Sequence, residues 1–382
     1  MLYRGVSIQS GQAVEVSVEG GLIDGVAVIE DEPSLPYMSP GFFDMQVNGY
    51  RGIDYGYSGL EPEDVEPLVF SLASSGITGH LATVITNPPE VVMERLDILH
   101  SAVEQSAVVG DALMGIHVEG PFISPEDGPR GAHDPHYVRD PDFSLFHEWY
   151  DASKGMIKMI TLAPELNGAI EFIEKVSDLG VVCAIGHTAA GADRIKEAVD
   201  AGARLSTHLG NGSHASLPRL RNHIWEQAAE DRLWASIICD GYHLPPAVVR
   251  VMARAKGLAR LILIGDSTGL TGKPPGKYTW GKTETKIAED GHITLSGTPY
   301  LAGAGFLLDW DIAHFISYTG VSLGDAVTLC TENPSRFFGI TPNRIEAGAP
   351  ANLTLFDYAP GMDRLEIRTT LLAGKKLYSS TG

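Results

Sequence analysis

The feature that most constrains the fold is a regular alternation of apolar runs and amphipathic segments through the middle of the chain. Amphipathic segments with helical spacing separate the runs, for example "GAIEFIEKVSDLG" and "GADRIKEAVDAGA". The apolar runs cover residues 41–49, 76–86, 113–122, 157–165, 181–188, 204–211, 234–243 and 260–268. A buried strand followed by a helix, repeated in this way, predicts an α/β protein built as a (β/α)8 barrel.

A doubly wound open parallel sheet is built from the same units and is the alternative fold. Such sheets often carry a glycine-rich dinucleotide fingerprint directly after the first strand. The first run, "GFFDMQVNG", is not followed by one. The barrel is therefore the favoured interpretation.

The two ends of the chain have a different pattern. Residues 1–38 and 343–382 are short, alternating and punctuated by glycine, which is typical of antiparallel strands. Neither piece is long enough to bury a core alone, so we expect both to pair into one small β-sandwich domain. The predicted division is this small β-domain, 1–38 plus 343–382, and a catalytic barrel over 39–342.

Charge and cysteine usage narrow the partners and the compartment. The chain has 382 residues with 48 acidic against 28 basic side chains, a formal charge of −20, which argues against nucleic acid and anionic membranes as partners. Cys183, Cys239 and Cys330 lie far apart in apolar stretches, as expected of free thiols in a reducing compartment. The N-terminus lacks a secretory apolar region, and no apolar run approaches the ~20 residues of a membrane helix. We therefore expect a cytoplasmic protein.

Polar side chains recur where the apolar runs end. In a barrel of parallel strands, these ends meet on one face, where active sites are built. One such residue alone has an ordinary structural explanation, such as capping the next helix. Capping does not readily explain the whole set, because polar residues stand at the ends of many of the predicted strands. These residues are Gln46, Asn48, Glu119, Glu165, His187, His208, Asp240, His243 and Asp266.

Three of these residues form a metal-ligand set. His187 and His208 end adjacent strands, 21 residues apart, and Glu119 ends an earlier strand. Two imidazoles and a carboxylate are a common set for a catalytic metal with an open position. The predicted ion is Zn²⁺, with Fe²⁺, Co²⁺ or Mn²⁺ as alternatives. His117 shares the strand with Glu119 and is expected to support the site from the barrel interior.

Asp266 follows the run "RLILIGDST" and is expected near that metal. A carboxylate beside a metal site suits a general base that later acts as a general acid. The alternative role of Asp266 is to cap the following turn.

At this point the motifs resemble the amidohydrolase superfamily and, within it, the N-acetylglucosamine-6-phosphate deacetylase family. The resemblance covers nearly the whole chain, through "SPGFFDMQVNG", "GIHVEGPF", "RGAHDP", "TLAPE", "IGHTAA", "THLGN", "CDGYH", "GDSTG" and "RIEAGAPANLTLFD". It implies one metal ion per subunit held by Glu119, His187 and His208, with Asp266 as catalytic acid/base. It also implies that His133, in "RGAHDP", holds or polarises the amide carbonyl.

The resemblance further implies contacts to a sugar phosphate. The matching positions are Asn211, the backbone amide of Gly212, His243 and Arg219. Arg219 falls where the family reaches into a neighbouring subunit, so a homodimer is implied. By composition, Arg221 is an equal candidate for this role.

Several motifs depart from the family pattern. Gln46-x-Asn48 replaces the His-x-His of many amidohydrolases, and amides are weak zinc ligands, so a single metal is expected. "NGSHA", "GDS" and "GTPYLAGAG" stand where the family has "NAM", "TDA" and "GTLAGS". These motifs lie near the sugar and the acyl group, so they affect the identity of the substrate more than the metal chemistry.

The expected activity is hydrolysis of N-acetyl-D-glucosamine 6-phosphate to D-glucosamine 6-phosphate and acetate, in amino-sugar catabolism. One alternative is a related amidohydrolase acting on N-acetylgalactosamine 6-phosphate, an N-acyl amino acid or a cyclic imide. Another is a non-catalytic binding protein with the same fold, although such proteins usually lose their metal ligands. For the Gly- and Pro-rich segment 269–300, the sequence leaves open a moving lid or a static β-excursion.

Overall fold

The structure is a computed structural model that describes residues 1–57, 59–281, 283–298 and 300–380. Its centre is an eight-stranded parallel sheet whose strands follow one another in sequence order. Five of the strands are buried along their whole length, which matches their almost purely apolar sequences. The strands are β5 (Phe42–Val47), β8 (Ile77–Ile85), β9 (Leu113–Glu119), β10 (Ile157–Leu162), β11 (Val182–Ile185), β12 (Leu205–Ser206), β13 (Trp234–Ile237) and β14 (Leu261–Leu263).

The sheet closes on itself at the carboxyl ends of its first and last strands. Val47 and Ser267 form a parallel bridge. On either side of it, the Asp266 amide donates to the Gln46 carbonyl (3.0 Å) and the Asn48 amide donates to the Ser267 carbonyl (2.8 Å). The predicted (β/α)8 barrel is therefore confirmed, and the closing bonds lie beside the predicted site.

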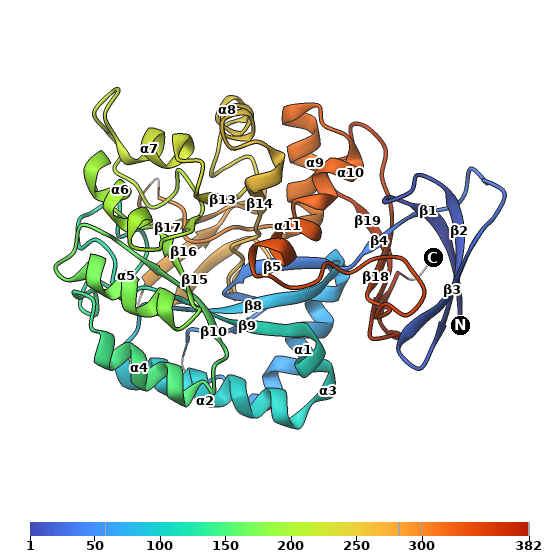
Figure 1. The fold of residues 1–382 in the computed structure, drawn as a ribbon, viewed down its shortest axis with the longest axis horizontal. Helices are drawn as coiled ribbons and strands as arrows, with labels where there is room; N and C mark the ends of the chain where they lie inside the picture. The colour runs from blue at the N-terminus through green and yellow to red at the C-terminus, as the bar shows by residue number, and fades with distance from the viewer. Residues whose placement is uncertain (58, 282, 299, 381–382) are drawn as a thin grey trace.

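Helices surround this sheet and cover its outer face (Figure 1). Helix α5 shows why: Ala169, Phe172, Ile173 and Val176 are buried on one stripe with helical spacing. The helices are α1 (Pro62–Leu72), α2 (Pro89–Gln105), α3 (Ala107–Ala112), α4 (Phe143–Ala152), α5 (Ala169–Asp178), α6 (Ala192–Asp200), α7 (His223–Ala229), α8 (Pro246–Lys256), α9 (Leu308–Thr319), α10 (Leu323–Thr328) and α11 (Glu332–Phe337), with 3-10 turns η1 (Ala73–Ser75) and η2 (Leu258–Arg260). None of the helices in the described part of the chain combines the length and the apolar character that a bilayer crossing requires.

The two ends of the chain build one seven-stranded sheet beside the barrel, at the right of Figure 1. β4 pairs with β1 on one side and with β18 on the other, so the N-terminal and C-terminal strands form a continuous sheet. The predicted division after residue 38 falls inside β4. The strands are β1 (Leu2–Ser7), β2 (Ala13–Glu19), β3 (Leu22–Val28), β4 (Tyr37–Pro40), β18 (Leu353–Asp357), β19 (Glu366–Leu372) and β20 (Lys375–Ser379).

The segment after β14 forms a small antiparallel sheet of β15 (Gly276–Trp280), β16 (Thr283–Ile287) and β17 (Ile293–Leu295). Lys282 and Pro299, which belong to the segment 269–300, lie outside the described residues. Trp280, Ile287 and Ile293 of this sheet pack with Ile85 from the end of β8. The segment is thus a β-excursion with its own apolar contacts to the barrel mouth. A two-stranded ribbon, β6 (Gly49–Tyr50) and β7 (Ile53–Asp54), follows β5.

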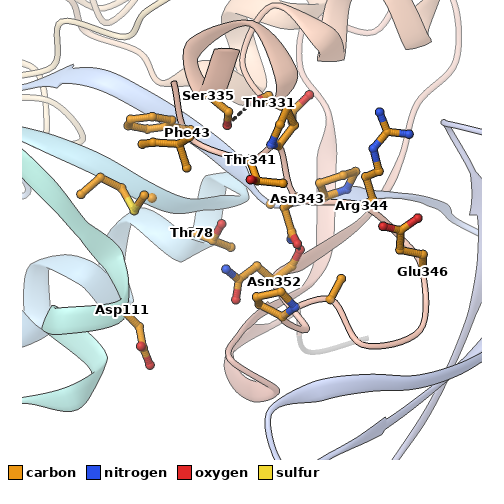
Figure 2. Close-up of a pocket in the computed structure, with 18 of the residues that line it drawn as sticks. Phe43, Thr78, Asp111, Thr331, Ser335, Thr341, Asn343, Arg344, Glu346 and Asn352 are labelled. Carbon is orange, nitrogen blue, oxygen red and sulfur yellow. Dashed lines mark hydrogen bonds between the residues drawn. The ribbon is translucent and has the colours of Figure 1, made fainter. Parts of the chain in front are cut away.

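A cavity of about 580 Å³ lies at the opposite end of the barrel, between the start of the barrel strands and the seven-stranded terminal sheet. Figure 2 shows this cavity, with Phe43 and Thr78 from the barrel strands, Asn352 directly before β18, and Asn343 from the segment between α11 and β18. Because these residues precede or begin the strands, the cavity is separate from the strand ends that carry the predicted site.

Candidate active site

Four predicted residues lie together at the carboxyl ends of the barrel strands. Glu119 is the last residue of β9, and His187, His208 and Asp266 each follow a strand by two or three residues. All four side chains are buried. Parallel strands bring these positions to one face, as the sequence predicted.

The backbone at three of these residues has a left-handed conformation. The φ angles are 51° at His187, 31° at His208 and 48° at Asp266. Side chains other than glycine rarely adopt this region, at a cost of about 1–2 kcal/mol each. These three residues stand where the chain leaves β11, β12 and β14.

Glu119, His187 and His208 present three ligand atoms to one point. Glu119 Oε1 lies 2.9 Å from His208 Nε2 and 3.3 Å from His187 Nε2, and the two Nε2 atoms are 3.1 Å apart. A tetrahedral ion with bonds of about 2.0–2.1 Å separates its ligand atoms by about 3.3 Å. The spacing therefore suits a divalent cation.

The hydrogen bonds around the cluster support the same conclusion. His187 Nδ1 donates to the Pro129 carbonyl (2.9 Å), so the lone pair of the neutral ring is on Nε2 and faces the cluster. Glu119 is buried, which favours the neutral acid, yet its contacts with both histidines hold its pKa well below its ordinary value. A carboxylate and two imidazole nitrogens converging in a buried space are the donor set that a cation requires.

Two amide side chains hold the carboxylates in place. Gln46 Nε2 donates to Glu119 Oε1 (2.9 Å) and to Asp266 Oδ1 (3.1 Å), and Asn48 Nδ2 donates to Asp266 Oδ1 (2.8 Å). In this arrangement both amides act through their nitrogen atoms. Gln46 and Asn48 therefore behave as hydrogen-bond donors to the acidic groups.

Asp266 carries a raised pKa. Burial and, next, the charge of Glu119 raise the pKa of this carboxyl to about 6, and the hydrogen bond from Asn48 opposes the shift. A carboxyl poised between acid and base near neutral pH suits a group that accepts a proton and later returns it.

His133 lies beside the cluster. The centroids of the His133 and His187 rings are 4.5 Å apart. One ring nitrogen of His133 lies within 4.8 Å of a ring nitrogen of His187 and of a carboxylate oxygen of Glu119. Burial lowers the pKa of His133 to about 3, so the ring is neutral. Its Nδ1 is hydrogen-bonded to Thr86 Oγ1 (2.8 Å). When the Thr86 hydroxyl is the donor, Nε2 carries the proton and can donate to an oxygen in the cavity.

His243 also faces the cavity. Its Nδ1 is 2.8 Å from Asp240 Oδ2, and its buried Nε2 has no hydrogen-bond partner among the described residues. Burial lowers the pKa of His243, but the Asp240 carboxylate outweighs this and raises it above the ordinary value. Asn211 and Gly212 line the same cavity, and a Cβ at Gly212 would meet His187 Nδ1 at 2.8 Å.

The structure does not bring Arg219 to this cavity. Arg219 lies on the exposed loop before α7, and Arg221 lines a separate surface pocket of about 290 Å³. Glu165 and His117 also lie outside the cavity. Glu165 accepts hydrogen bonds from Thr188 Oγ1 and the Ala189 amide (both 2.6 Å), and His117 is hydrogen-bonded to Thr161 in the barrel interior.

The sequence did not point to several residues of the cavity, which has a volume of about 150 Å³. Trp280 and Tyr300 come from the segment after β14, Ile85 is the last residue of β8, and Ala132 comes from the loop after β9. Thr86, the partner of His133, was missed as well. The longer "GTPYLAGAG" motif was the only signal for part of this set, since Tyr300, Leu301 and Gly303 of that motif line the cavity.

Comparisons with known proteins agree with this geometry. No family model matches the chain. An N-acetylglucosamine-6-phosphate deacetylase from Danio rerio is 31% identical over 355 residues, covering 89% of this chain and 84% of the relative. The enzyme of the same name from Bacillus subtilis (strain 168) is 29% identical over 372 residues, covering 93% and 92%. A crystal structure of N-acetyl-D-glucosamine-6-phosphate deacetylase from Mycobacterium smegmatis superposes with a TM-score of 0.88 at 27% identity, covering 99% of this chain and 100% of that one.

The similarity extends over both the barrel and the terminal sheet, and it agrees with the motifs at the strand ends. The chain belongs to the N-acetylglucosamine-6-phosphate deacetylase family of the amidohydrolase superfamily.

Proposed function

We propose that this protein hydrolyses N-acetyl-D-glucosamine 6-phosphate to D-glucosamine 6-phosphate and acetate. The observation that carries the proposal is the convergence of Glu119 Oε1, His187 Nε2 and His208 Nε2 within 3.3 Å of one another, with Asp266 tied to the cluster through Gln46. Curated relatives that share about 30% of the sequence carry this activity in their names.

We propose that Glu119, His187 and His208 hold one divalent ion per subunit. Zn²⁺ is the first choice for this donor set, and Fe²⁺, Co²⁺ or Mn²⁺ are the alternatives. When bound, such an ion lowers the pKa of water toward neutrality and polarises a carbonyl group.

The chain's own groups then do the proton transfers. Asp266 accepts a proton from the attacking water and donates it to the departing amine, so the same carboxyl acts as base and then as acid. Gln46 and Asn48 hold that carboxylate in position through their amide donors. His133 donates a hydrogen bond to the oxygen that becomes negatively charged as the acetyl carbon is attacked.

The sugar phosphate is proposed to lie against the other side of the cavity. His243 Nε2, which has no hydrogen-bond partner in the described ranges, provides polar contacts there together with Asn211 and the Gly212 backbone amide. Arg219 is proposed to reach the phosphate in a neighbouring subunit, because it is exposed and remote from the cavity of its own chain. We therefore propose a homodimer, and a cytoplasmic location in keeping with three buried free cysteines.

An acetate-release assay on the zinc-loaded protein tests the function. N-acetylglucosamine 6-phosphate should be the best substrate in a panel that also contains N-acetylgalactosamine 6-phosphate, N-acetyl amino acids and dihydropyrimidines. Preference for another member of the panel would select the corresponding alternative amidohydrolase. Absence of hydrolysis from every substrate, with one ion bound per chain, would overturn the proposal and favour a binding protein.

A further inference from the structure

We infer that Trp280 limits the length of the acyl group that this site accepts. The inference rests on the proposed function, because it assigns a wall of the same cavity to one part of the substrate. The residue comes from β15 of the β-excursion, a segment that the proposed chemistry does not otherwise use.

An amide at the reacting centre has two substituents, and the cavity has two kinds of wall. One wall is apolar and is formed by Ile85, Ala132 and Trp280, which pack in one cluster. Other residues that line the cavity offer polar groups, among them Asn211 and His243. A sugar phosphate would leave its hydroxyl and phosphate oxygens unpaired against the apolar wall, so the acyl chain belongs there.

The apolar wall begins next to the group that would contact the carbonyl oxygen. Ala132 directly precedes His133, and Ile85 directly precedes Thr86, the hydrogen-bond partner of His133. An amide whose oxygen faces His133 therefore places its acyl carbon beside these two residues. Trp280 belongs to the same apolar cluster and lines the same cavity.

The indole of Trp280 is fixed in place. Its Nε1 donates to Asp54 Oδ2 (3.0 Å), and the same carboxylate accepts hydrogen bonds from the Gly269 and Gly56 amides (both 2.9 Å). The ring of Tyr57 meets the indole edge-on at 5.2 Å. Only 7% of Trp280 is exposed. A longer acyl chain therefore cannot be accommodated by rotation of this side chain alone.

Because the cavity is small, the apolar wall is expected to discriminate between acyl groups of different length. It measures about 150 Å³, below the roughly 300–1,000 Å³ typical of ligand pockets. Against an apolar wall, one extra methylene changes kcat/KM by about 10–200-fold. The wild-type protein is therefore expected to prefer acetyl to butyryl by at least about 100-fold.

The experiment measures kcat/KM for glucosamine 6-phosphate carrying N-formyl, N-acetyl, N-propionyl and N-butyryl groups. Trp280→Ala should reduce the acetyl-to-butyryl ratio by about 10-fold or more, because the space of the indole becomes available to the chain. Trp225→Ala removes a half-exposed tryptophan from α7 and should leave the ratio unchanged. An unchanged ratio in Trp280→Ala would overturn the inference.

A second variant covers the case in which Trp280→Ala does not fold. Ile85→Ala removes part of the same apolar wall, at the end of β8, so the cavity becomes larger and the acetyl-to-butyryl ratio should shift in the same direction. A folded Ile85→Ala protein with the wild-type ratio would contradict the assignment. The inference and the proposed function fail in different ways. If the wild-type protein deacetylates the substrate but neither variant changes the acyl preference, only the inference about Trp280 is wrong. If the wild-type protein does not deacetylate the substrate, the proposed function is wrong.

Discussion

Asn48 and Asp266 are joined by a 2.8 Å hydrogen bond, although 218 residues separate them in the chain. The bond ties the end of the first barrel strand to the end of the last one. It also lowers the pKa of Asp266 against the effect of burial. Asn48 is thus a positioning residue for the proposed acid/base.

Asn48→Ala should therefore change both the rate and its pH dependence. Loss of the donor raises the pKa of Asp266, so the acidic limb of the kcat/KM profile should move to higher pH. We also expect kcat to fall about 10-fold, since the carboxylate loses one of its two amide donors. The profile measured from pH 5 to 9 checks this. A profile identical to that of the wild type would show that Asn48 does not act on Asp266.

Asp266→Asn should separate metal binding from catalysis. The three proposed metal ligands are untouched, whereas an amide cannot accept and return the proton. The expected result is a full complement of metal with kcat reduced by about 10²–10⁴-fold. Metal analysis and acetate release on the same sample provide the measurement. Near-normal turnover would refute the assignment of the acid/base.

His208→Ala should abolish metal binding. The imidazole lies 2.9 Å from Glu119 and 3.1 Å from His187, so its removal leaves only two ligand atoms at the centre. We expect the bound metal to fall from about one ion per chain to a small fraction, with a lower melting temperature than the loaded wild type, because an ion that binds only the folded state stabilises it. His136→Ala, at an exposed histidine, is the matched control and should keep its ion. Retention of a full ion by His208→Ala would place the metal elsewhere.

Asp309 should make the free energy of unfolding depend on pH. This residue lies in the first turn of α9, and burial raises its pKa to about 7, with Arg364 as an opposing charge 3.9 Å away. The pKa of an aspartate in an unfolded chain is about 4. The contribution of Asp309 to the stability of the folded state is therefore full below pH 4 and is lost as the pH rises through 7. Asp309→Asn lacks this loss, so its stability relative to the wild type should rise from pH 4 to about 7. Urea denaturation of both proteins across this range checks the trend, and a constant difference would contradict it.

Lys154→Gly should stabilise the protein. Lys154 is exposed and has a φ of 52°, directly after the end of α4. Glycine adopts this conformation without the Cβ clash, so the free energy of unfolding should rise by about 0.5–1 kcal/mol. Lys196→Gly, in the interior of α6, is the control and should lower it by about 1 kcal/mol. Destabilisation by both substitutions would show that Lys154 makes a contact that outweighs its strain.

The sequence alone predicts the convergence of the acidic and imidazole groups. The reason is topological: side chains at the carboxyl ends of parallel strands meet on one face, so Glu119, His187, His208 and Asp266 could be grouped without knowledge of any contact. The roles of Gln46 and Asn48 could not be read in this way, because a donor to two carboxylates and a weak metal ligand look the same in a sequence.

Other features depend on backbone geometry that residue patterns do not encode. The run 204–211 predicts a strand of eight residues, but β12 covers only Leu205–Ser206. The left-handed turn at His208 ends the extended conformation early. Trp280 could not be placed either, since its position depends on a hydrogen bond to Asp54, 226 residues away.

The continuous terminal sheet has a consequence for how the chain is made. β4 lies between β1 and β18, so one edge of β4 has no partner until residues 353–357 have been synthesised. The barrel likewise cannot close before Ser267 emerges to meet Val47. A ribosome-bound chain therefore presents an open parallel sheet and an uncovered strand edge during most of its synthesis. During that part of translation the unpaired strand edges are open to pairing with other chains, which favours aggregation.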